Sequence, residues 1–130
     1  MKPSTREWVK KAENDFKVAS QILRRRSDIV PDAACFFCQQ CAEKYLKARL
    51  TEAGATFPRT HDLLMLLNLT VKVEPRWCAF AKAADTMTDY AVDFRYPGHS
   101  ATLREARLAL KHCRAIRNEA RRSLKLKAKP

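Results

Sequence analysis

One edge of an otherwise apolar stretch, residues 31–54, carries polar side chains at helical spacing. Gln40, Lys44 and Lys47 share this edge when residues are placed about 100° apart. An amine beside so much apolar surface is costly unless it reaches water, a carboxylate or an anion. Two interpretations therefore stay open. Either the lysines bind phosphate, or Glu43 neutralises one of them within the protein.

Three further side chains are candidates for the same anion. His61 follows a loop at the start of a short predicted helix, and Arg95 lies in a turn between two predicted helices. In that turn Arg95 can bind a phosphate while Tyr96 stacks on a base. Alternatively, Arg95 caps the preceding helix and Tyr96 only fixes the bend. Two isolated glycines cannot build a phosphate loop, so any phosphate must contact side chains or helix ends.

Cysteine and histidine give weaker signals. Cys35, Cys38 and Cys41 have a spacing that recurs in iron–sulfur and zinc sites. They lie on the apolar side of one predicted helix, however, with no fourth ligand nearby, so we predict buried packing residues, no metal and no cofactor. The three histidines fall on separate elements, which does not indicate nucleophilic catalysis.

Basic charge gathers towards the two ends of the sequence. The net charge is +12; residues 1–26 hold eight Lys or Arg and three acids, and residues 101–130 hold ten and two. Clustered basic charge is typical of proteins that bind polyanions such as RNA, DNA or an acidic partner. The alternative is that it only keeps the protein soluble.

Helical patterns account for nearly the whole chain. Apolar residues make up 46% of it, and apolar positions recur at helical rather than alternating spacing. We therefore predict one all-α domain over residues 1–130, with a flexible basic tail from about 125. The predicted helices cover residues 4–26, 31–54, 60–71, 75–94 and 100–124, with Thr60 as the cap of the third.

Two acidic features allow more than one reading. Asp15 falls on the apolar side of the first predicted helix, either as a buried structural carboxylate or as part of a site. Asp85, Asp89 and Asp93 recur outside the fourth, as a solvated face, a contact for a basic partner or a weak cation site.

The predicted location is cytoplasmic. The first residues are charged, unlike those of a secretory signal, and no apolar run approaches membrane-spanning length. Three of the five cysteines crowd into one helix, which fits reduced thiols better than a disulfide framework.

Several motifs together carry a family resemblance. They are QxxxKxxK at residues 40–47, THDL at 60–63 and RYP at 95–97, before a long final helix. In this order and spacing they resemble the HEPN family, named for nucleotide binding in higher eukaryotes and prokaryotes. The resemblance spans nearly the whole chain.

The resemblance implies an up-and-down bundle of four main helices with an additional short one, generally paired as a homodimer. It also implies nucleotide or RNA binding, and many small prokaryotic members are encoded beside a minimal nucleotidyltransferase in toxin–antitoxin-like pairs. We expect such a module here, with that partner protein. The expected binding residues are Gln40, Lys44, Lys47, His61, Arg95 and Tyr96.

Other members of the family are metal-independent ribonucleases that use an Arg, four to six residues and a His. Arg95 and His99 lie in the corresponding region with only three residues between them. Arg107 and His112 match the spacing but lie within one predicted helix, where they point roughly 140° apart. A ribonuclease toxin, with a site completed across a dimer, is therefore the alternative function. A pure protein-interaction module is the second alternative.

Overall fold

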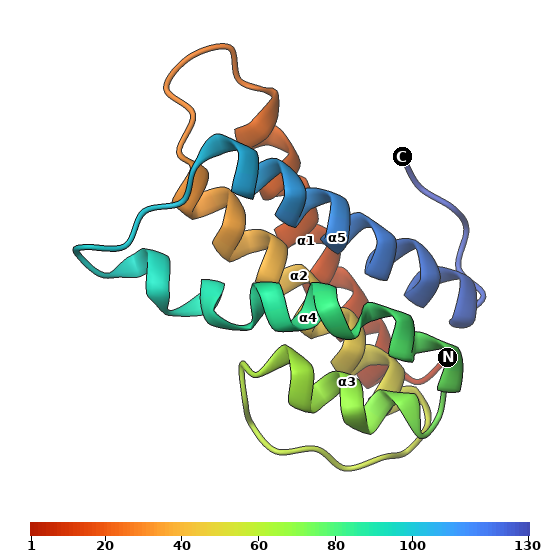
Figure 1. Cartoon of the computed structure of the whole chain (residues 1–130). Coiled ribbons are helices and arrows are strands. Elements are labelled where there is room, and N and C mark those ends of the chain that lie inside the picture. The colour runs from red at the N-terminus through yellow and green to blue at the C-terminus, as the bar shows by residue number, and fades with distance from the viewer.

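The computed structural model describes residues 1–130 and contains helices but no strands (Figure 1). The predicted all-α fold is confirmed. The α-helices are α1 (Pro3–Arg24), α2 (Pro31–Glu52), α3 (Leu63–Val71), α4 (Ala81–Met87) and α5 (Leu103–Ser123). Short 3-10 helices are η1 (Pro75–Phe80), η2 (Thr88–Ala91) and η3 (Asp93–Arg95).

Helix α2 is the central element of the bundle. Pro31 begins it, and Gly54, with a φ of +73°, lies just beyond its end. Helices α1 and α5 pack along it, while α3 and η2 cover other parts of its surface (Figure 1). Most of its side chains from Ala34 to Leu50 are buried, as the apolar composition of this segment predicts.

The three cysteines of α2 are packing residues, as predicted. Cys35, Cys38 and Cys41 are completely buried with free thiols, and small alanines on α1, α2 and α5 surround them in the same core. Small side chains let the helix backbones approach closely, so that the larger leucines and aromatic residues fill the remaining space.

An ion pair that no sequence pattern predicted ties α1 to α5. Arg117, with 2% of its surface exposed, donates from Nε and Nη2 to the two carboxylate oxygens of Glu13 at 2.7 and 2.9 Å. The Tyr45 hydroxyl of α2 also donates to Glu13, and Arg121 donates to that hydroxyl at 3.2 Å. One carboxylate thereby joins three helices.

The predicted fourth helix is not continuous. Residues 75–95 form η1, α4, η2 and η3 in succession, with a break at Val92 (φ −120°, ψ −57°). The Thr88 hydroxyl donates to the Ala84 carbonyl at 2.8 Å, a local bond that bends helices. The bend lets the rings of Tyr90 and Phe94 pack with centroids 4.9 Å apart.

The predicted cap of the third helix is wrong by two residues. The Asp62 carboxylate accepts from the Met65 backbone N–H at 3.1 Å, so that Asp62 caps a helix beginning at Leu63. Thr60 instead accepts from the Asp62 N–H at 3.1 Å. His61 therefore precedes the helix, at the end of the loop that follows α2.

Residues 125–130 turn back beside α5 (Figure 1). Lys125 has a φ of +59°, and Arg121 donates twice to the Lys127 carbonyl at 3.0 and 2.8 Å. Arg117 donates to the Lys129 carbonyl at 3.1 Å. Two side chains of α5 thus form hydrogen bonds with the backbone of this tail. Separately, none of the helices combines the length and apolar character needed to cross a bilayer.

Candidate functional site

A cavity of about 420 Å³ opens between α2 and the bend after α4. Gln40 comes from α2, His61 from the loop before α3, and Arg95 and Tyr96 from the segment that the break at Val92 redirects. The fold therefore brings together four of the six expected binding residues, which lie far apart in sequence. The complete lining is Phe36, Gln40, His61, Ala91, Val92, Arg95 and Tyr96.

Arg95 carries an unpaired positive charge at this cavity. Its guanidinium carbon lies 5.0 Å from the centroid of the Phe36 ring, and it forms no ion pair. A guanidinium stacked on a ring keeps its N–H edges available for a phosphate. Tyr96 beside it is 62% exposed, which leaves its ring face accessible. The Arg95 side chain forms no hydrogen bond that would cap η3, so no contact supports the capping interpretation.

A buried carboxylate orients His61. Nδ1 of His61 lies 2.7 Å from Oε1 of Glu43, and the His61 carbonyl accepts from Nε2 of Gln39 at 2.9 Å. The Glu43 side chain is 3% exposed, whereas the imidazole is 65% exposed. Because the carboxylate accepts, the proton resides on Nδ1, and Nε2 is the nitrogen available to a ligand.

Lys44 and Lys47 do not line the cavity. Nζ of Lys47 lies 3.1 Å from Oε2 of Glu43 and 5.4 Å from the centroid of the Trp8 ring, and the side chain is buried. Lys44 pairs with Asp15 of α1. The lysines share the predicted edge of α2, but carboxylates within the protein neutralise both. This is the internal neutralisation that the sequence left open.

Asp15 is a structural carboxylate. Burial raises the pKa of its carboxyl group, and the hydrogen bond and charge of Lys44 only partly offset this effect. The carboxylate is kept in the interior as the partner of Lys44.

The residues considered for ribonuclease activity are not assembled within one chain. Arg107 lines a groove on the α1 side of α5. Burial lowers the pKa of His112, and the charges of Lys111 on the same helix and of Lys82 on α4 lower it further. His112 does not line the groove that Arg107 lines. His99 is exposed in the turn after Tyr96 and lies outside the cavity that Arg95 lines.

Phe36 and Glu43 contribute to the cavity in ways that were not predicted from the sequence. Phe36 supports Arg95, and Glu43 serves Lys47 and His61 together. Their signal was present, because residues 36, 40, 43 and 47 recur at the spacing of one helical face. No cluster of three potential metal-ligating side chains occurs among these or other residues.

A family model described as the HEPN domain matches residues 5–123. The chain belongs to the HEPN domain family. The match includes α1 to α5, so the cavity and both buried ion-pair networks lie within the HEPN domain. The resemblance inferred from the three sequence motifs is confirmed.

A solved structure shows the same HEPN fold. The crystal structure of TT1696 from Thermus thermophilus superposes with a TM-score of 0.72 at 24% sequence identity, covering 91% of this chain and 96% of that one. At this identity the likeness shows the fold alone. No curated protein matches the chain.

Proposed function

We propose that this HEPN domain binds a nucleotide or a nucleotide of an RNA chain in the cavity at Arg95. The observation that carries the proposal is the unpaired Arg95 beside the exposed Tyr96 ring. Nucleotides present a phosphate and an aromatic base, which guanidinium groups and aromatic rings recognise respectively. The family resemblance points to the same class of ligand.

The remaining polar groups of the cavity suit a base or a ribose. Nε2 of Gln40 donates to Gln39 at 2.7 Å, so the Gln40 carbonyl oxygen is available as an acceptor. Nε2 of His61 is available on another part of the lining. Lys44 and Lys47 act here as supports of the α2 wall, because their charges are already paired.

Substitution of Arg95 by glutamine is expected to weaken nucleotide binding about tenfold or more, because a charge-assisted hydrogen bond to phosphate is lost. The measurement is calorimetric titration with adenosine and uridine 5′-monophosphates. Tyr96→Ala is expected to weaken binding and Tyr96→Phe to preserve it. Arg76→Gln, an equal charge change on η1, is the matched control and should bind normally. If Arg95→Gln bound every nucleotide as tightly as wild type, the cavity would not be the site.

A second candidate function, metal-independent RNA cleavage, is favoured by the Glu43-oriented His61 in the cavity of Arg95. Nε2 of His61 would take the proton of a ribose 2′-hydroxyl, whose oxygen attacks the adjacent phosphorus. The 5′-oxygen leaves and is protonated, which yields a 2′,3′-cyclic phosphate and a 5′-hydroxyl end. Arg95 would stabilise the charge on the phosphoryl oxygens.

If cleavage occurs through His61, it should persist in EDTA, fail on the matching 2′-deoxy strand and be lost in His61→Gln. The measurement is gel analysis of a labelled structured RNA, with His99→Gln as the matched control. Loss of cleavage in His99→Gln alone would instead favour the Arg–His arrangement of the family's ribonucleases. If no RNA is bound or cut even at low salt, the protein-interaction alternative takes precedence.

We further propose that the domain forms a homodimer and pairs with a minimal nucleotidyltransferase in a toxin–antitoxin-like system. Val92 at the cavity and Val30 before α2 are exposed apolar side chains that fit a protein contact. Sedimentation velocity across concentrations tests the dimer, and a constant monomer mass would contradict it. Co-purification with the nucleotidyltransferase tests the pair.

A further inference from the structure

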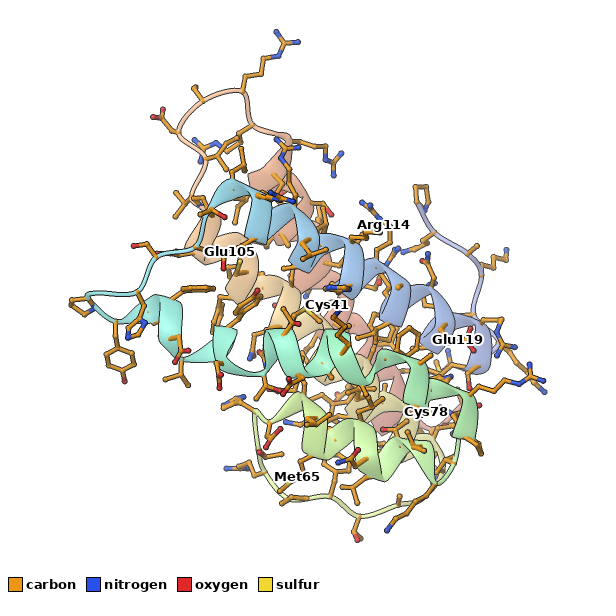
Figure 2. All side chains as sticks on the ribbon, viewed as in Figure 1. Cys41, Met65, Cys78, Glu105, Arg114 and Glu119 are labelled. Carbon is orange, nitrogen blue, oxygen red and sulfur yellow. The ribbon has the colours of Figure 1, made fainter.

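A second hollow lies between α1 and α5 and shares no residue with the cavity at Arg95. It consists of two adjoining parts of about 560 and 360 Å³, and we call it the α1–α5 groove. Both parts are lined by Phe16, Ser20, Arg24 and Pro130. Figure 2 shows Arg114, which also lines it, rising from α5 on the side away from α4.

The groove contains basic side chains that have no acidic partner within the protein. Lys17, Arg24, Arg107 and Arg114 line it, and none of them forms an ion pair. The one acidic side chain in the lining, Glu13, has both carboxylate oxygens occupied by Arg117. Four like charges that line one groove favour the entry of an anion.

A buried hydroxyl without a partner lines both parts of the groove. Ser20 is 7% exposed, and its Oγ is the one buried side-chain polar atom in the protein with no hydrogen bond. A buried, unsatisfied hydroxyl costs about 1–3 kcal/mol. The hydroxyl of a serine within a helix commonly donates a hydrogen bond to the carbonyl four residues earlier, but that of Ser20 does not. The hydroxyl is therefore available to a ligand in the groove.

The spacing of the cations favours a chain of phosphates over a single one. Arg107 and Arg114 are seven residues apart on α5, which corresponds to about 10 Å along the helix axis. Arg24 approaches from α1 on the other wall. The side chain of Phe16 lies under Arg114, with 5.7 Å from its ring centroid to the guanidinium carbon. Lys129 of the returning tail adds a further cation at one end of the groove.

We propose that the α1–α5 groove binds the sugar–phosphate backbone of a single-stranded nucleic acid. Arg107, Arg114 and Arg24 pair with successive phosphates, and the Ser20 hydroxyl donates to a phosphate oxygen. The inference rests on the proposed function because it takes the same class of ligand, but it assigns a separate site. The cavity at Arg95 holds one nucleotide, and the groove holds the backbone of a strand.

The first test compares two double variants of equal charge. Arg107→Gln/Arg114→Gln is expected to weaken binding of a fluorescent single-stranded oligouridylate of about twelve nucleotides tenfold or more and to reduce its salt slope by about 1.4, roughly 0.7 per lost contact. Lys72→Gln/Arg76→Gln, at exposed positions outside the groove, should change the affinity less than about twofold. Fluorescence anisotropy over a salt series measures both.

The second test uses Ser20→Ala. This variant should weaken oligouridylate binding about three- to tenfold without lowering thermal stability, because the hydroxyl makes no bond within the protein.

Equal losses of affinity in the two double variants, or wild-type affinity in Arg107→Gln/Arg114→Gln, would overturn the proposal. If Arg95→Gln loses both mononucleotide and oligouridylate binding while the groove variant loses neither, the groove fails and the cavity stands. If mononucleotide binding is absent but the groove variant still loses the strand, the cavity fails alone.

Discussion

Replacement of Arg117 by alanine is expected to lower the free energy of unfolding by about 3 kcal/mol, because it leaves the half-buried Glu13 carboxylate without its bidentate partner. The aromatic contact of Arg117, whose guanidinium carbon is 4.0 Å from the Phe16 ring centroid, is lost as well. Urea denaturation at neutral pH measures the change. Arg114→Ala is the matched control, because Arg114 is exposed and makes no ion pair. Similar losses in the two variants would mean that the ion pair adds nothing.

The same network predicts a pH dependence. Burial alone would raise the pKa of Glu13, but hydrogen bonds from Arg117 and Tyr45 and the charges of Arg117 and Arg121 outweigh it and hold the pKa below its ordinary value. The carboxylate's stabilisation is therefore complete above the unfolded-state pKa of about 4.3 and is lost as the pH falls through the lower folded-state pKa. Wild type should lose stability more steeply in this acidic range than Glu13→Gln. Parallel acid profiles would contradict the assignment.

Replacement of Glu43 by alanine is expected to cost about 3–5 kcal/mol as well, because the buried Lys47 then has no counter-charge. His61 also loses the acceptor that orients its ring. Glu7→Ala is the control for loss of a carboxylate and should change stability by no more than about 0.5 kcal/mol, since Glu7 is exposed and forms no ion pair. Thermal and urea unfolding measure both variants.

The double variant Glu43→Leu/Lys47→Met separates the structural role of Glu43 from its role at the cavity. Replacement of a buried ion pair by apolar side chains of similar size is often neutral or stabilising, so we expect most of the lost stability to return. Nucleotide binding should remain weaker than in wild type, because His61 is still without its acceptor. Full recovery of both properties would show that the orientation of His61 does not matter for binding.

The buried Glu43 thus connects the stability of the fold to the geometry of the cavity. One carboxylate oxygen neutralises Lys47 and the other holds His61. Because both contacts lie on α2 or on the loop that follows it, the loop cannot move far without exposing a buried charge. This explains how an exposed histidine on a loop is held in one orientation.

Local sequence features predicted most of the secondary structure. Pro31 and Gly54 mark the ends of α2 because proline suits the first turn of a helix and glycine adopts the left-handed conformation beyond it. Apolar spacing predicted the buried cysteines and the inward faces of α1 and α5. The angle of roughly 140° between the directions of Arg107 and His112 also follows from helix geometry alone, since both lie on α5.

The tertiary structure decided which charges meet and where the hollows form. Lys44 pairs with Asp15, 29 residues away in the sequence, and Arg117 pairs with Glu13, 104 residues away. The periodicity of one helix does not give the axial offset between two packed helices, which decides these pairs. The same offset places an unsatisfied Ser20 between α1 and α5. The break at Val92, which carries Arg95 to the wall of the cavity, accompanies the packing of Tyr90 against Phe94, a contact that helix propensity does not encode. The sequence by itself therefore determined the helices and their faces. The packing of those helices paired Lys44 and Lys47 with carboxylates and left Arg95 as the unpaired cation of the cavity.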